Sequence, residues 1–235
     1  MAQRVHIIAE GQTEERYVNK VLVPHLGNVF QVVVDVRCVH TGRDEEGRWY
    51  RGGLLDYEKA RRDIQSWMNE EKKNPKVFFT TMFDLYALPE NFHAFAEAKR
   101  ERDPYARVCV IEEAMRKEFD HTRFFPYVQL HEFEALILAD PQKLDWEYLE
   151  HEKAIASLVR LAESSNPEEI NDGPNTHPAR RIIAEIQEYE DQKAAVGPVV
   201  AEKIGLEVLR KRCCHFGEWI ARLEHPLKQD SATLT

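Results

Sequence analysis

The N-terminal stretch of the chain constrains its fold most strongly. Residues 4–9 form a short apolar run that ends at Glu10-Gly11. From Tyr17 onward, apolar side chains recur at helical spacing, so the pattern predicts a buried strand that passes directly into a helix. Such a unit opens an α/β sheet. Ligands of open α/β sheets bind beyond the carboxyl ends of the strands, so Glu10 stands where a functional acid is expected.

Three later segments have the composition of strands. Residues 30–39 and 76–83 are rich in β-branched and aromatic side chains, and the second of them is followed by Asp84. Residues 123–130 form another such run, in which Pro126 favours an edge strand or a bulge. We therefore expect four strands in the N-terminal part of the chain.

Helical patterns separate these strands. Residues 55–71 carry an apolar stripe and are followed by Asn74-Pro75, which stops a helix. Asp103-Pro104 has the form of an N-cap and first-turn proline, and opens a second helix that extends to Phe119. The alternation of strands and helices predicts an α/β fold with a mostly parallel four-stranded sheet and helices on both faces.

Residues 41–53 contain four glycines and are expected to form an exposed loop. A loop of this length is often functional. Its arginines could contact phosphates and its aromatic residues could stack on bases, while a solvated loop with an aromatic anchor is the alternative. The residues concerned are Arg43, Arg48, Trp49, Tyr50 and Arg51.

The second part of the chain is helical in pattern. We place an approximate boundary at Asp140-Pro141, which divides an α/β domain at 1–140 from a helical region at 141–235 packed on or beside it. Helices are expected at 155–162, 178–189, 196–212 and 215–223. Turn-forming segments separate them, among them Gly197-Pro198.

Composition excludes several classes of protein. Hydrophobic residues make up 43% of the chain, but no run approaches the ~20 apolar residues of a membrane span. Glu10 interrupts the only apolar stretch near the N-terminus, and the four cysteines lack CxxC spacing, so we expect a cytoplasmic protein without membrane contact. The net charge of −9 argues against a protein that coats nucleic acid regardless of sequence.

Carboxylates follow three of the predicted strands. Glu10 and Asp84 come directly after two of them, and Glu132 and Glu134 follow the last. Parallel strands point the same way, so these acids converge if their strands are neighbours. Clustered like charges raise one another's pKa unless a cation compensates them. Oxygen ligands of this kind favour Mg²⁺, which activates water and stabilises the oxygens of a phosphoryl displacement.

Each of these acids also has a structural interpretation. Glu14 lies in a first helical turn, where the helix dipole favours an acid, and Asp84 could cap a turn. Glu132 and Glu134 share a face if their segment is extended, but diverge if a helix begins at Glu132. His131 could ligate a metal or cap the helix.

Three segments together resemble a known family. They are 7–14 (IIAEGQTE), 82–86 (MFDLY) and 129–136 (QLHEFEAL), and the last is the most specific. The chain resembles the domain-of-unknown-function family DUF4276, which is similar to Toprim nucleases of the overcoming-lysogenization-defect type. The resemblance extends over nearly the whole chain, because residues 176–181, Lys193, Gly205 and 214–216 also match comparable positions.

This resemblance implies a Toprim-like fold in 1–140 and a metal-dependent nuclease acting on DNA or RNA. It also implies a role in bacterial defence against phage or other mobile DNA, beside an ATPase partner. Homo-oligomerisation is compatible with it. The cofactor would be Mg²⁺ or Mn²⁺.

Carried over by position, the roles fall on the following residues. Glu10, Asp84, Glu134 and Lys193 would be catalytic. Glu10, Glu14, Asp84, Glu132 and Glu134 would bind metal, with Glu10 a metal-linked acid or the general base. Gly11 is expected to contact the substrate. The residue type of Arg180, Arg181 and Lys193 and the basic shift near the C-terminus, rather than the resemblance, suggest that these cations approach the scissile phosphate. Arg180 and Arg181 as ordinary surface residues of a helix are the alternative.

The sequence departs from the Toprim pattern at one position. Tyr86 stands where the second acid of the usual Asp-x-Asp would be. Either the glutamates of the HEFEAL segment substitute for that acid, or the site is degenerate. The alternative function is therefore a non-catalytic module that binds an ATPase or effector subunit.

Overall fold

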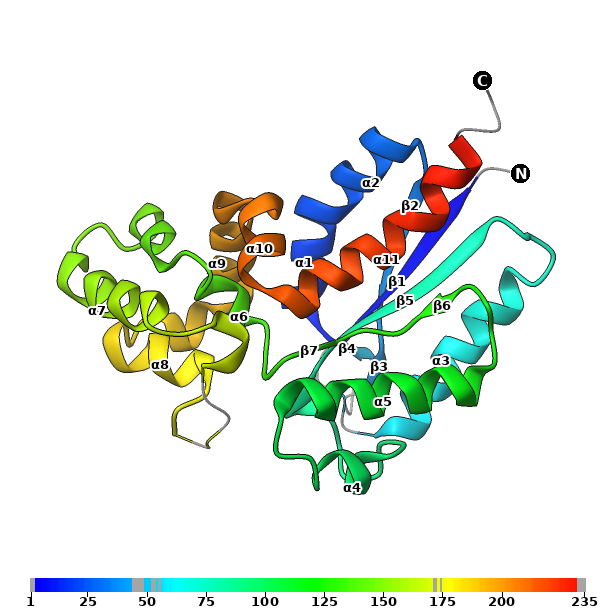
Figure 1. The fold of residues 1–235 in the computed structure, drawn as a ribbon, viewed down its shortest axis with the longest axis horizontal. Coiled ribbons are helices and arrows are strands. Elements are labelled where there is room, and N and C mark those ends of the chain that lie inside the picture. Colours follow the sequence, from blue (N-terminus) through cyan, green and yellow to red (C-terminus); the bar gives the residue numbers. More distant parts are fainter. Residues whose placement is uncertain are drawn as a thin grey trace.

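The computed structural model describes residues 3–43, 49–51, 54, 56–170, 173 and 175–231. The fold is α/β, with a mostly parallel sheet flanked by helices and followed by a helical C-terminal region, as the sequence predicts (Figure 1). The sheet strands are β1 (Arg4–Ala9), β2 (Val33–Cys38), β5 (Val77–Asp84), β6 (Phe124–Phe125) and β7 (Val128–Gln129). Their order across the sheet is β2-β1-β5-β6. Strand β7 also pairs with β5, farther along β5 toward its carboxyl end than β6 does.

Helices cover both faces of the sheet and gather beyond the carboxyl ends of its strands (Figure 1). The helices of the N-terminal part are α1 (Gln12–Tyr17), α2 (Val23–Phe30), α3 (Tyr57–Glu70), α4 (Phe95–Ala98) and α5 (Pro104–Phe119). A π-helical turn (Val18–Leu22) joins α1 to α2, and a 3₁₀ turn (Leu85–Ala87) follows β5. The later helices are α6 (Glu134–Ile137), α7 (Glu152–Glu163), α8 (Pro178–Glu185), α9 (Tyr189–Ile204), α10 (Leu206–Arg212) and α11 (Cys214–Ser231), with 3₁₀ turns at Pro141–Trp146 and Pro167–Glu169.

Two hydrophobic cores lie on the two faces of the sheet. Val5 and Ile7 of β1 belong to the core formed with α1, α2 and the C-terminal helices, whereas Ile8 belongs to the core under α3 and α5. This alternation follows the two-residue period of a strand. Both faces are therefore covered, as expected of a parallel sheet.

The second strand is shorter than the sequence suggests. We expected it over 30–39, but Phe30 ends α2 and the strand begins at Val33. Gln31 adopts a left-handed conformation (φ 57°) and its backbone N–H bonds to the carbonyl of Gly27, which ends the helix. The sequence does not reveal this helix end, because the left-handed residue that ends a helix is usually Gly or Asn, and here it is Gln.

The expectation of an exposed loop over 41–53 is corrected in part. His40–Arg43 (β3) and Trp49–Arg51 (β4) form a two-stranded antiparallel sheet. Arg48 lies outside the described residues, as do the side chains of Arg43 and of 49–51. The suggested role of this segment in nucleic-acid contact therefore stays a prediction.

The break between β6 and β7 coincides with Pro126. Both strands pair with β5 alone among the described strands, so the proline lies at the sheet edge, as expected. The hydroxyl of Thr81 bridges the break, because it donates to the Tyr127 carbonyl and accepts from the Tyr127 N–H, both at 2.9 Å. The acid-bearing segment after β7 is thus fixed to the strand that carries Asp84.

The helix break predicted at Gly197-Pro198 is wrong. Both residues lie inside α9, and the chain breaks at Gly205, whose φ is 85°. Pro198 lacks the N–H that would bond to the Ala194 carbonyl. The Arg16 guanidinium donates to that carbonyl instead, at 2.8 Å.

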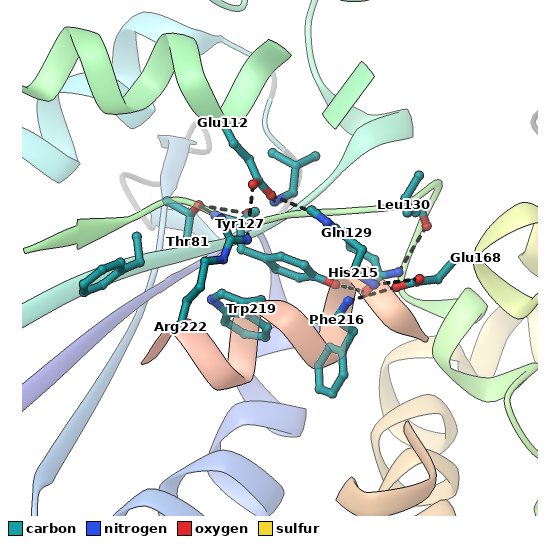
Figure 2. Close-up of polar contacts among 12 residues, drawn as sticks. Thr81, Glu112, Tyr127, Gln129, Leu130, Glu168, His215, Phe216, Trp219 and Arg222 are labelled. Carbon is teal, nitrogen blue, oxygen red and sulfur yellow. Dashed lines mark hydrogen bonds and ion pairs between the residues drawn. The ribbon is translucent and has the colours of Figure 1, made fainter. Parts of the chain in front are cut away.

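A buried polar network connects the last helix to the sheet (Figure 2). The Glu168 carboxylate accepts the backbone N–H groups of His215 and Phe216 at 2.9 and 3.0 Å, so it caps the first turn of α11. His215 Nε2 lies 2.9 Å from a Glu112 oxygen, and the other oxygen of Glu112 accepts from Arg222. The first of these oxygens also accepts the Val128 N–H of β7 at 3.0 Å, which joins the network to the sheet. Apolar residues from 141 onward belong to the same hydrophobic core as Val5 and Ile7 of β1. The division of the chain into two domains at residue 140 stays a prediction.

None of the described helices combines the length and apolar character needed to cross a bilayer.

The close approach of α10 and α11 gives a stability prediction. A Cβ atom at Gly217 would lie 2.4 Å from the Arg210 carbonyl oxygen. We expect Gly217→Ala to lower the free energy of unfolding, because overpacking typically costs ~1–3 kcal/mol and exceeds the helix-propensity gain of up to ~1 kcal/mol. Urea unfolding measures the change.

Gly27→Ala is the matched control. Its Cβ atom would meet only the Val32 carbonyl, at an ordinary 3.7 Å. We expect this variant to be at least as stable as the wild type. Equal stability of the two alanine variants would contradict the close contact at Gly217.

Candidate functional site

The predicted carboxylates line one pocket. Its volume is about 390 Å³, and it lies where β1, β5 and β7 end. Its lining residues are Glu10, Gly11, Gln12, Thr13, Glu14, Asp84, Glu132, Phe133, Glu134, Lys193 and Ala194. We call this cavity the acidic pocket.

Strand register explains why these acids meet. In the pairing of β1 with β5, Ala9 is opposite Met82, so Glu10 emerges beside the end of β5. Its backbone N–H bonds to the Met82 carbonyl at 3.0 Å. In the pairing of β5 with β7, Asp84 is opposite Gln129. Three adjacent parallel strands thus deliver carboxylates to one edge, as the sequence pattern predicts.

Backbone N–H groups orient the acids at the carboxyl ends of β1 and β5. One Glu10 oxygen accepts the Asp84 N–H at 2.9 Å, and one Asp84 oxygen accepts the Phe133 N–H at 3.1 Å. Glu14 accepts the Gly11 N–H at 2.8 Å, a local bond that closes the turn between β1 and α1. The second oxygen of Asp84 is buried without a hydrogen-bond partner. Such an orphaned oxygen is a candidate ligand for a cation.

Both glutamates of the HEFEAL segment reach the pocket. Helix α6 begins at Glu134, so Glu132 lies in the turn before it. Glu132 accepts from His177 Nδ1 and from the Ala179 N–H, each at 2.6 Å, and therefore caps the N-terminus of α8. Glu134 accepts the Tyr189 hydroxyl at 3.1 Å. The sequence left open whether Glu132 and Glu134 face the same way. In the structure, both line the acidic pocket.

The acidic pocket holds protons more tightly than isolated carboxylates do. Burial raises the pKa of Glu10 to about 7. Burial and the neighbouring charge of Glu10 raise the pKa of Glu14 to about 8. Burial, then the charges of Glu14 and Glu10, hold the pKa of Asp84 well above its usual range. Burial, then the charge of Glu132, raises the pKa of Glu134 to about 7, and Lys193 opposes that shift.

Lys193 brings a positive charge to the acidic pocket from a distant part of the chain. It is in α9, which packs against α1. The bond from Arg16 to the Ala194 carbonyl joins the two helices beside the pocket. Gly197 leaves room for the Tyr189 hydroxyl of the same helix and lets α9 approach the α6 segment. A Cβ atom there would lie 3.1 Å from that hydroxyl oxygen, and 3.4 and 3.6 Å from the Phe133 and Ile137 side chains. The packing of α9 against α1 and α6 therefore positions both Lys193 and Tyr189, whose hydroxyl bonds to Glu134.

The donor set of the acidic pocket fits a hard divalent cation. Its five carboxylates supply the oxygen ligands that Mg²⁺ and Mn²⁺ prefer, and one oxygen of Asp84 is buried without a partner. Within the described part of the chain, no group of three Asp, Glu, His or Cys side chains is arranged so that it could hold a metal ion as it stands. Binding of a cation would thus require side-chain rotations.

Some predicted site residues lie elsewhere. Neither arginine proposed to contact substrate lines the acidic pocket. Arg180 pairs with Glu190 at 3.6 Å, and Arg181 donates to the Thr176 carbonyl. Tyr86 and His131 line a neighbouring cavity instead. His131 has a left-handed backbone (φ 62°) and makes no helix cap, since α6 starts later at Glu134.

Sequence analysis missed two residues that orient the glutamates. His177 bonds to Glu132, and Tyr189 bonds to Glu134. His177-Pro178 carries one usable signal, since proline in the first turn indicates that a helix starts there. Nothing in the local sequence of Tyr189 indicates its partner, which is 55 residues away.

Comparison with known proteins identifies one family. The model of the family described as "Domain of unknown function (DUF4276)" matches residues 9–224. No curated protein and no solved structure matches the chain.

The raised pKa of Glu14 predicts a pH-dependent stability. Its value of about 8 exceeds the ordinary 4.5, so between these values the folded chain binds more protons than the unfolded chain. The penalty for burying its charge therefore grows as pH rises from 5 to 8. Without divalent metal, we expect Glu14→Gln to gain stability relative to the wild type over this range, because Gln does not titrate. Urea unfolding at several pH values measures the difference.

Glu207→Gln is the control, since Glu207 is exposed in α10 and lies outside the acidic pocket. Its stability should follow that of the wild type. Parallel curves for the wild type and Glu14→Gln from pH 5 to 8 would contradict the raised pKa.

Proposed function

The chain belongs to the DUF4276 family, and we propose that it is a nuclease that hydrolyses phosphodiester bonds of DNA or RNA with Mg²⁺ or Mn²⁺. One observation carries this proposal. Five carboxylates and Lys193 line a single pocket at the carboxyl ends of adjacent parallel strands. This edge is where α/β sheets bind ligands.

Electrostatics favours a cation and an anionic substrate together. Carboxylates with raised pKa values strain the folded state unless protons or cations compensate them. A phosphodiester alone would be repelled from so many acids. A divalent cation held by these carboxylates would remove the repulsion and would accept phosphate oxygens and water as further ligands.

The residues best placed to hold the cation are Glu10 and Asp84, with Glu132 or Glu134. The Asp84 backbone N–H donates to the Glu10 carboxylate, and both residues are anchored to the sheet. Bonds from His177 and Tyr189 restrain the two later glutamates, a form of support typical of metal sites. When bound, the cation would lower the pKa of water and offset charge on the phosphate.

Other groups of the chain have separate tasks. The Lys193 ammonium binds a non-bridging phosphate oxygen and stabilises the charge that develops there. Glu10 would be the metal-linked acid or, through an oxygen that does not bind the cation, the general base that accepts a proton from the attacking water. Gly11 also lines the acidic pocket, where a residue without a side chain would let the substrate approach the chain backbone closely.

Other parts of the proposal rest on the family resemblance. They are the likeness to Toprim nucleases, the role in defence and the ATPase partner. Arg180 and Arg181 lie on α8, whose N-terminus contacts Glu132, so they could contact substrate that extends beyond the acidic pocket.

Hydrolysis of labelled DNA and RNA tests the proposal. We expect cleavage with Mg²⁺ or Mn²⁺ and none with EDTA. Glu10→Gln and Asp84→Asn should each lower the rate at least about 100-fold, because loss of a group that stabilises the transition state has effects of this size. The exposed Glu207→Gln variant is the matched control and should cleave like the wild type.

Equal cleavage by Glu10→Gln and the wild type would contradict the mechanism.

The non-catalytic module is the alternative, since Tyr86 stands where Toprim nucleases have an acid. Calorimetric titration with Mn²⁺ separates the two. Binding that Asp84→Asn abolishes supports the metal site, whereas an adaptor needs none.

A further inference from the structure

A second cavity adjoins the acidic pocket. Its volume is about 360 Å³, within the range of small-molecule sites. It lies between α4, α5 and the segments that follow β5 and β7. Its lining residues are Leu85, Tyr86, Phe95, Ala98, Lys99, Arg107, Ile111 and His131. We call it the aromatic pocket.

Chain connectivity places the two cavities side by side. Tyr86 follows Asp84 by two residues, and His131 directly precedes Glu132. The Tyr86 N–H bonds to the His131 carbonyl at 2.9 Å, which joins the two segments. The Tyr86 ring lies 5.3 Å from the ring of His177, the residue that bonds to Glu132. Tyr86 thus stands at the boundary between the aromatic pocket and the acidic pocket.

The walls of the aromatic pocket combine flat apolar surface with positive charge. Leu85 and Ile111 supply aliphatic surface, and the rings of Tyr86 and Phe95 supply aromatic surface. Two cations complete the lining. The Lys99 ammonium lies 6.0 Å from the centre of the Phe95 ring, and Arg107 reaches the cavity from α5 while its guanidinium donates to the Glu101 carbonyl.

Aromatic walls and cations are the combination that binds single-stranded nucleic acid. Bases stack on aromatic rings whatever their sequence, and Lys or Arg attracts the phosphates. A base within a duplex has both faces covered by its neighbours, so it must be unpaired and unstacked to enter a pocket. A pocket of this kind would therefore select an unpaired nucleotide over a duplex.

We propose that the aromatic pocket binds one unpaired base of a single-stranded DNA or RNA, next to the phosphate held in the acidic pocket. This inference rests on the proposed function and narrows its substrate class to single strands or unpaired ends. Tyr86 stacks on the base, and Lys99 contacts the flanking phosphate. Tyr86 thereby has a role of its own at the position where the Toprim pattern has an acid.

Binding of short fluorescent strands tests the inference. The probes are eight-nucleotide single strands of DNA and of RNA, each with one central 2-aminopurine, in buffer with Ca²⁺. We expect saturable quenching of the 2-aminopurine by the wild-type protein. Tyr86→Ala should weaken binding about tenfold, in line with the loss of one stacked base. Lys99→Ala should weaken binding several-fold and reduce its salt dependence.

Trp146→Ala is the matched control, because Trp146 is an exposed aromatic residue outside both pockets. It should bind as the wild type does. Tyr86 is 41% exposed, so its replacement should leave the fold intact, which circular dichroism checks. A competitor strand with the same phosphates but no bases should compete about tenfold less well than a normal strand.

The outcomes separate this inference from the nuclease proposal. Quenching that Tyr86→Ala weakens supports the base site even if no hydrolysis is found, and the DNA and RNA probes show which sugar is accepted. Three results overturn it, with or without nuclease activity. They are no binding of either probe, equal binding by Tyr86→Ala, and equal competition by the base-free strand.

Discussion

Mutual repulsion among buried carboxylates is the constraint on which the rest of the site depends. Parallel pairing of β1, β5 and β7 fixes the strand ends in register, so Glu10, Asp84 and the glutamates after β7 must share one edge. Burial then raises the pKa of Glu10 and Glu134 to about 7. A group of acids in this state retains protons or recruits cations. The need to compensate these charges, by protons or by a cation, thus follows from the sheet geometry.

The C-terminal helices complete this site rather than merely cover the sheet. Helix α9 brings Lys193 and Tyr189 to the acids, and α8 presents its N-terminus and His177 to Glu132. Glu168 caps the start of α11, and Glu112 links His215 of that helix to the Val128 N–H of β7 (Figure 2). These contacts join segments far apart in the chain, so mutations in the helical region should alter the acidic pocket.

The sequence was sufficient for the parallel sheet and the convergence of its acids, because both follow from local patterns and strand direction. Local patterns could not reveal bonds between distant segments. Gly197-Pro198 looks like a helix break, but Arg16 satisfies the carbonyl that Pro198 leaves unpaired, and α9 continues. The partner of Glu134 is Tyr189, and no spacing rule relates the two. Side-chain contacts between distant segments thus determine the extent of α9 and the partner of Glu134, which the periodicity of the sequence cannot predict.

Crystals soaked in Mn²⁺ test the central claim most directly, since anomalous scattering locates the ion. An Mn²⁺ peak in the acidic pocket, within bonding distance of Glu10 and Asp84 and of Glu132 or Glu134, is the expected result. Crystals of Asp84→Asn should show a much weaker peak or none. Absence of a peak at saturating Mn²⁺ in wild-type crystals, or a peak that involves none of these acids, would contradict a metal-dependent site.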